Sequence, residues 1–174
     1  MDLRSGYPFW TVRNGLLNPF PPLEQDLSCD VVVVGAGITG ALIARSLVAA
    51  GLRVVILEQR DVGWGSTSAS TALLQYEIDV ELIPLAKQFG IENAVAAYKA
   101  CERAIHTLKG FAKGQGKGEF RDQRSLYVAS HWYHVNRLRQ EAALRQRHGF
   151  AMRVLERAQL QRQFDIDAPS LRRN

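Results

Sequence analysis

The clearest pattern in the chain is a run of four valines at residues 31–34, with no polar residue among them. Such a run is typical of a strand that is buried on both faces of a parallel sheet. A second apolar run, Val-Val-Ile-Leu, occupies residues 54–57. Residues 38–50 between them are mostly apolar and are followed by Gly51, which predicts a helix with a left-handed glycine cap. The pattern therefore predicts a strand–helix–strand unit.

A glycine-rich turn lies where the first strand meets this helix. Gly35, Gly37 and Gly40 form the pattern G-x-G-x-x-G. We expect Gly35 to turn the chain sharply, Gly37 to leave room for a pyrophosphate, and Gly40 to let helix and strand pack closely. The backbone N–H groups of Ile38 and Thr39 are expected to face the anion at the positive end of the helix dipole. The turn therefore predicts a dinucleotide site.

An acidic residue, Glu58, ends the second strand and follows Gly35 by 23 residues. This offset is close to the roughly 20 residues at which an acid binds the ribose hydroxyls of a dinucleotide. A carboxylate there repels a 2′-phosphate, so NADP is disfavoured. A glycine pattern alone is a weak signal, but its place between two strands and the acid favour a dinucleotide over a purely structural turn.

The segment after Glu58, residues 59–71, is rich in glycine, serine and threonine. One interpretation is a surface linker. The segment leaves the carboxyl end of the second strand, however, which is the edge where open α/β sheets bind their ligands. Nicotinamide dehydrogenases usually pass directly from the acid into a helix, whereas flavoproteins often use such a loop for the cofactor.

At this point the sequence resembles a known family. The runs VVVVGAGITG and VGWGSTSASTALLQYEID, with Glu58 between them, are similar to the amino-terminal part of FAD-dependent oxidoreductases of the D-amino-acid oxidase group. That group includes glycine and sarcosine oxidases and the γ-glutamylputrescine oxidase type. The resemblance spans the whole chain, and its specific motifs lie in residues 30–79. It implies FAD as the cofactor and oxidation of a small-molecule amine or amino acid by hydride transfer to the flavin.

Carried over position by position, the resemblance implies three groups of cofactor-binding residues. The pyrophosphate would be bound by Gly35, Gly37, Ile38, Thr39 and Gly40. The adenosine ribose would be bound by Glu58, with Gln59 and Arg60 near the adenosine. The phosphates or the flavin side of the groove would be contacted by Ser66, Thr67 and Ser68. We assign no catalytic residue and no metal ligand.

Beyond residue 79 the apolar positions recur at helical spacing. Asp79 is expected to cap a short helix that contains Leu82, Ile83 and Leu85. The stripe of a longer helix comprises Ile91, Val95, Tyr98, Cys101, Ile105, Leu108 and Ala112. A third helix is predicted for residues 131–148, with Ser130 as its cap and Gly149 at its end. Its inner face would consist of Trp132, Val135, Leu138 and Ala142, and its solvated face would carry the pairs formed by Arg137, Glu141 and Arg145.

Shorter elements complete the prediction. Residues 125–129 and 152–155 are predicted as strands, and residues 156–164 as a short amphipathic helix. The fold class is therefore α/β, with a Rossmann-like FAD-binding βαβ unit and additional helices and strands of a partial substrate-side region. We divide the chain into a lead-in arm without regular structure because of its prolines (1–28), the βαβ unit with its cofactor loop (29–79), and a helical and strand segment (80–174).

The composition of the chain limits the classes of ligand and partner that it is expected to bind. The net charge of +5 suits an anionic cofactor and is too small to indicate nucleic acid. The chain has no apolar run of about 18 residues and no signal peptide, so we expect no membrane span and a cytoplasmic protein.

Three hypotheses stay open. The first is an FAD-dependent amine or amino-acid oxidoreductase, present as an amino-terminal fragment. The second is a non-catalytic dinucleotide-binding remnant, or half of a split enzyme that needs a complementary carboxy-terminal chain. The third is an NAD-dependent protein.

Overall fold

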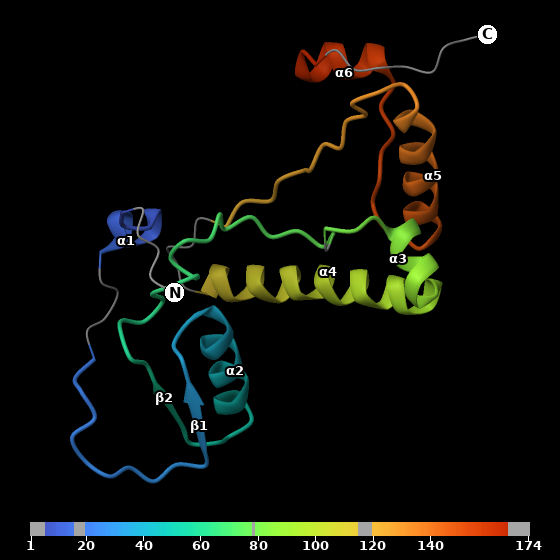
Figure 1. Cartoon of the computed structure of the whole chain (residues 1–174). Helices are drawn as coiled ribbons and strands as arrows, with labels where there is room; N and C mark the ends of the chain where they lie inside the picture. The colour runs from blue at the N-terminus through green and yellow to red at the C-terminus, as the bar shows by residue number, and fades with distance from the viewer. Residues whose placement is uncertain (1–5, 16–19, 78, 115–119, 167–174) are drawn as a thin grey trace. The chain divides into compact units, whose positions relative to one another are not determined.

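A computed structural model describes residues 6–15, 20–77, 79–114 and 120–166 (Figure 1). The chain forms two compact units, Met1–Leu73 and Leu74–Asn174. The division of the sequence at residues 28/29 and 79/80 stays a prediction.

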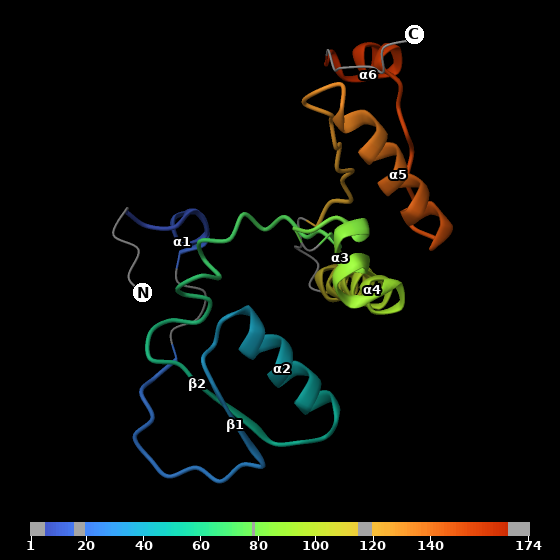
Figure 2. The ribbon, with the colours of Figure 1, turned by 45° about the vertical axis from the view of Figure 1, so that its right-hand side comes forward.

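The first unit contains the predicted strand–helix–strand arrangement. Strands β1 (Val31–Val34) and β2 (Val54–Leu57) pair in parallel, from Val31 opposite Val54 to Val34 opposite Leu57. Helix α2 (Ile38–Ala49) connects them and packs against both, as Figures 1 and 2 show. Gly51 has φ +85° and donates its N–H to the Val48 carbonyl at 2.9 Å. The left-handed cap is therefore confirmed, and α2 ends one residue before the predicted position.

The expectation that β1 is buried on both faces was wrong. The side chains of Val32 and Val34 are 51% and 86% exposed, while Val31 and Val33 are half-buried. Side chains alternate between the faces of a strand, and α2 covers one face of this pair. Among the described residues of this unit, no other helix or strand covers the second face.

The arm before β1 contains one helix that the sequence did not predict. Helix α1 spans Phe9–Asn14 and begins directly after Pro8, whose carbonyl accepts hydrogen bonds from Thr11 and Val12 at 3.1 and 3.2 Å. The prolines were expected to prevent regular structure throughout the arm, and this was wrong for residues 9–14. No proline lies inside these residues, and a proline that precedes a helix removes no intrahelical N–H.

The second unit is helical in its described residues. It contains α3 (Leu82–Phe89), α4 (Ile91–Gly114), α5 (His134–Arg147) and α6 (Arg157–Phe164). Its core is built around Tyr98 and Leu82, whose side chains are fully buried. The Tyr98 ring meets the Phe150 ring edge-on at 5.7 Å, and the Tyr76 ring stacks on Phe150 at 5.5 Å. Aromatic contacts thus join α4 to the segments that flank α3 and α5.

The four predicted helices of this unit are confirmed, but two predicted caps were wrong. The N-cap position of α3 is Glu81 rather than Asp79, and α5 begins at His134 after Tyr133 rather than after Ser130. Trp132, expected on the inner face, lies before α5 and is 55% exposed.

The prediction of two additional strands was also wrong. Residues 125–129 and 152–155 adopt neither helix nor strand in the structure. A strand needs a hydrogen-bonded neighbour, and β1 and β2 are the only strands among the described residues. High intrinsic strand propensity at Tyr127 and Val128 is therefore not sufficient.

Candidate functional site

The glycine turn between β1 and α2 bends sharply at Gly35 and packs closely at Gly40. Gly35 adopts φ +102°, and its N–H donates to the Leu57 carbonyl at 2.7 Å. A Cβ atom placed on Gly40 would lie 2.0 Å from the Gly35 carbonyl oxygen. Only glycine fits at position 40, because any side chain would displace the turn. The close packing expected of Gly40 is therefore confirmed.

Glu58 is bonded directly to this turn. One carboxylate oxygen accepts the N–H of Ala36 at 2.7 Å, and the other accepts the N–H of Arg60 at 3.0 Å. These two bonds hold the pKa of Glu58 below its usual value, and the bond from Ala36 has the larger effect. A carboxylate has about four acceptor positions, so this one can accept further hydroxyl donors.

The loop after β2 contacts the same turn from the other side. The Thr67 hydroxyl oxygen accepts the N–H of Ile38 at 3.0 Å, and a Cβ atom on Gly37 would lie 3.2 Å from that oxygen. The Gly63 N–H donates to the Ala36 carbonyl at 2.9 Å. We expected a free N–H at Ile38, but in the structure this N–H is bonded to the Thr67 hydroxyl.

The other predicted site residues differ in their surroundings. The Ser68 side chain is buried and donates to the Gly65 carbonyl at 2.8 Å, so its hydroxyl proton is used within the loop. The residues Thr39, Gln59, Arg60 and Ser66 are exposed. The structure therefore joins the glycine turn, Glu58 and Thr67 by direct hydrogen bonds.

Two participants were missed. Ala36 lies inside the glycine pattern, and its N–H is the donor that fixes Glu58. The Trp10 indole N–H donates to the Ser70 carbonyl at 2.8 Å and so connects α1 to the loop. The place of Ala36 inside the glycine pattern is the signal, since its N–H faces the end of the neighbouring strand. Nothing in the sequence pattern indicates the contact of Trp10.

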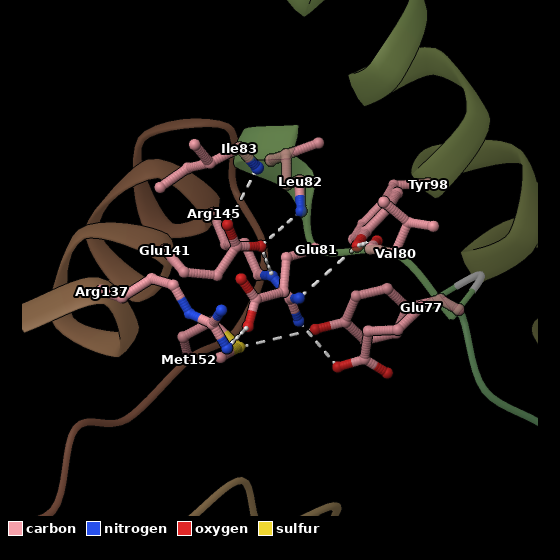
Figure 3. A network of polar contacts seen from close by, with 11 residues as sticks. Glu77, Val80, Glu81, Leu82, Ile83, Tyr98, Arg137, Glu141, Arg145 and Met152 are labelled. Carbon is pink, nitrogen blue, oxygen red and sulfur yellow. Dashed lines mark hydrogen bonds and ion pairs between the residues drawn. The ribbon is translucent and has the colours of Figure 1, made fainter. Parts of the chain in front are cut away.

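A buried polar network occupies the second unit (Figure 3). The Glu141 carboxylate of α5 accepts the backbone N–H groups of Leu82 and Ile83 at 2.6 and 2.9 Å. It therefore caps α3, whose own N-cap residue forms no side-chain cap bond. Glu141 was expected on the solvated face of its helix, and this was wrong because the N-terminus of α3 requires an acceptor there.

Arg145 completes this network. Its guanidinium donates to Glu141 at 2.7 Å and to Glu77 at 2.8 Å, and it lies 3.5 Å from the Tyr98 hydroxyl. Figure 3 shows the Arg145 side chain close to the Glu141 carboxylate and the Tyr98 hydroxyl. The Tyr98 hydroxyl in turn donates to the Val80 carbonyl. Burial raises the pKa of Tyr98 to about 12. Arg145, also expected to be solvated, is a buried structural residue.

The described residues contain no group of three or more His, Cys, Asp or Glu side chains placed to bind a metal ion. Within the same residues, no helix is both long and apolar enough to cross a membrane. The cellular location stays a prediction.

The comparison with protein families identifies the class to which this chain belongs. Residues 30–172 match the DAO family, FAD dependent oxidoreductase. The chain therefore belongs to this family of FAD-dependent oxidoreductases, which confirms the family resemblance stated from the sequence.

Several curated proteins are similar to parts of the chain. The candidate Rieske 2Fe-2S iron-sulfur protein YhfW of Bacillus subtilis is 35% identical over 102 residues, which cover 59% of this chain and 20% of that protein. The gamma-glutamylputrescine oxidoreductase of Escherichia coli is 37% identical over 78 residues, which cover 44% of this chain and 18% of that protein. The putrescine oxidase of Kocuria rosea is 36% identical over 102 residues, covering 50% and 21%.

The chain spans about a fifth of the length of these relatives. No solved structure matches the chain.

Proposed function

We propose that residues 30–72 bind the adenosine diphosphate part of FAD, in an enzyme that oxidises an amine or an amino acid. The observation that supports this proposal most is the hydrogen bond from the Ala36 N–H to the Glu58 carboxylate at 2.7 Å. It joins the predicted ribose-binding acid to the predicted pyrophosphate-binding turn in one site. The family membership of the chain gives independent support for the flavin.

The residues present fit the phosphate groups of such a cofactor. Gly37 carries no Cβ atom, which leaves room for the Thr67 hydroxyl oxygen, 3.2 Å from where that atom would lie, and for a phosphate bound to it. The Thr67 hydroxyl accepts from Ile38 and keeps its own proton to donate, which a phosphate oxygen can accept. In this proposal Gly35 and Gly40 shape the turn, Thr39 contributes its backbone N–H at the N-terminus of α2, and the Ile38 N–H holds the Thr67 hydroxyl beside the phosphate.

The residues around Glu58 fit the adenosine part. The carboxylate accepts two backbone N–H groups and has acceptor positions left for the two ribose hydroxyls. Gln59 and Arg60 follow it at the exposed end of β2, where they border the adenosine. In the cofactor loop, Ser66 is exposed toward solvent and Ser68 holds the loop in shape through the Gly65 carbonyl.

The proposed substrate is a small amine or amino acid. Two of the relatives are named for such reactions, the gamma-glutamylputrescine oxidoreductase and the putrescine oxidase. When bound, the flavin supplies the hydride acceptor, and the residues of this chain orient its adenosine diphosphate end. The chain spans about a fifth of the length of these relatives, so the activity and substrate of the whole enzyme are part of this proposal.

The test is retention of FAD by the purified chain, followed by its visible absorption spectrum after removal of unbound cofactor. We expect a retained flavin spectrum, and a lower affinity in Glu58→Ala. A hydrogen bond to a charged group contributes about 1.5–3 kcal/mol, so the dissociation constant is expected to rise by at least about tenfold. Glu92→Ala, which removes an exposed acid at the start of α4, is the matched control.

Two results would contradict the proposal. Equal affinity of the wild type and Glu58→Ala would remove the ribose role of Glu58. Saturable binding of NADH without retention of FAD would favour the NAD-dependent alternative.

A further inference from the structure

Trp10 of helix α1 is hydrogen-bonded to the cofactor loop. The Trp10 indole N–H donates to the Ser70 carbonyl at 2.8 Å, across 60 residues of sequence. The ring is half-buried, and its neighbours hold it in place. The Phe9 ring lies edge-on at 5.0 Å, and the Arg13 guanidinium lies 5.7 Å from the centre of the indole. Figures 1 and 2 both place α1 beside the segment that follows β2.

The Ser70 carbonyl belongs to a turn that carries Thr67. The Ser70 N–H donates to the Thr67 carbonyl at 3.3 Å, and the Ser70 hydroxyl accepts the Ala72 N–H at 3.1 Å. Thr67 in turn accepts the Ile38 N–H at 3.0 Å. Hydrogen bonds therefore connect Trp10 through this turn to the N-terminus of α2.

The loop is otherwise ordered by hydrogen bonds at Gly63, Thr67 and Ser68 rather than by the packing of large apolar side chains. Residues 63–70 consist of glycine, serine, threonine, alanine and one tryptophan, so they bury few large side chains. Glycine-rich backbone loses much conformational entropy when it is fixed, and a ligand that orders it must supply that free energy. A loop already held at Ser70 requires less ordering when a ligand binds.

We propose that Trp10 is a positioning residue that preorganises the Thr67 turn over the glycine turn, and thereby raises the affinity for the cofactor. The proposal rests on the proposed function, because it assigns the loop to the same FAD site. Trp10 acts through Ser70 and Thr67 and does not itself touch the cofactor. It gives the otherwise unassigned lead-in arm a role in the site.

The experiment uses the whole chain with Trp10→Phe, which keeps an aromatic ring and removes the N–H donor. Trp132→Phe is the matched control, because Trp132 belongs to the second unit and is exposed. The dissociation constant for FAD is measured by titration, and amide hydrogen exchange of Ser70 and Ala72 is measured without FAD. We expect Trp10→Phe to weaken FAD binding about fivefold, the equivalent of about 1 kcal/mol, and to accelerate both exchange rates. Trp132→Phe should change neither quantity.

The possible failures are distinguishable. Unchanged FAD affinity and unchanged exchange in Trp10→Phe, with a wild type that binds FAD, would overturn the positioning role and leave the proposed function intact. Faster exchange with unchanged affinity would show a merely structural contact and would also overturn the role. A wild type that does not bind FAD would overturn the proposed function and the positioning role with it.

Discussion

The two units use their polar groups in opposite ways. Around the glycine turn of the first unit, the Glu58 carboxylate and the Thr67 hydroxyl bond to backbone N–H groups and keep capacity for further partners. In the second unit, the side chains of Glu141 and Arg145 are only 4% and 7% exposed. The Glu141 carboxylate is bonded to three donors of the protein itself.

This difference indicates that the polar groups of the first unit serve ligand binding and those of the second unit serve stability. A polar group with unused bonding capacity at the surface can bind a ligand, whereas a buried group bonded on all sides can only hold the fold together. We therefore expect changes in the buried polar network of the second unit to alter the free energy of unfolding, and changes in the exposed polar groups around the glycine turn to alter mainly cofactor affinity.

The largest effect is expected for Arg145→Met. The change leaves the buried Glu141 carboxylate without its cationic partner, and removing one member of a buried pair costs about 3–5 kcal/mol. Urea unfolding followed by circular dichroism measures the loss. Arg139→Met is the control, because its pair with Glu156 is exposed and should contribute less than about 1 kcal/mol. Equal costs for the two variants would mean that the network is not a buried one.

A smaller loss is expected for Gly40→Ala. The new Cβ atom would lie 2.0 Å from the Gly35 carbonyl, so α2 must move away from β1. Overpacking of this kind costs about 1–3 kcal/mol in thermal or urea unfolding. Gly110→Ala in α4 is the matched change, since no atom lies within 4 Å of its added Cβ. That variant should gain up to about 1 kcal/mol from helix propensity. A tolerated Gly40→Ala would contradict the described packing.

Tyr98→Phe is expected to cost about 1–2 kcal/mol, because it removes the hydroxyl that donates to the Val80 carbonyl. The same residue predicts a pH effect. Its pKa is raised from 10 to about 12, so its contribution is present below pH 10 and is lost as the pH rises toward 12. Unfolding measured from pH 9 to pH 12 should show a loss in the wild type that is smaller in Tyr98→Phe. Parallel curves for both proteins would refute this role.

The smallest effect concerns Glu58. Its pKa lies below the ordinary value of 4.5 because the carboxylate accepts the Ala36 and Arg60 N–H groups. The associated stability is present above pH 4.5 and is lost as the pH falls through the lowered pKa. The carbon-13 shift of the Glu58 carboxyl, followed in folded and urea-unfolded protein, measures both midpoints. A folded midpoint at or above the unfolded one would exclude the bond to the glycine turn.

Local signals were sufficient for the strand–helix–strand arrangement of the first unit. The apolar runs, the spacing of Gly35 and Gly40, and the position of Glu58 depend on short stretches of sequence, and each element formed where it was predicted. Helix α1 was missed because the prediction considered how many prolines the lead-in arm contains and not where they lie. The burial of Val32 and Val34 was predicted wrongly because a run of four valines does not show whether another element covers each face of the strand.

The second unit required information that local sequence does not contain. Glu141 and Arg145 are four residues apart, a spacing that commonly marks an exposed ion pair on a helix. Their burial depends on α3, which begins 59 residues before Glu141 and lacks a capping side chain of its own. The predicted strand at residues 125–129 failed for the same reason, since pairing depends on distant segments.

The most direct test of the separation between the units is a two-dimensional amide NMR spectrum recorded during addition of FAD. We predict saturable shifts for the amides of Ala36, Ile38 and Thr67, which line the glycine turn. The amides of Leu82 and Ile83, which are bonded to Glu141, should stay unchanged. Shifts confined to the second unit, or none in the glycine turn at saturating FAD, would contradict the account.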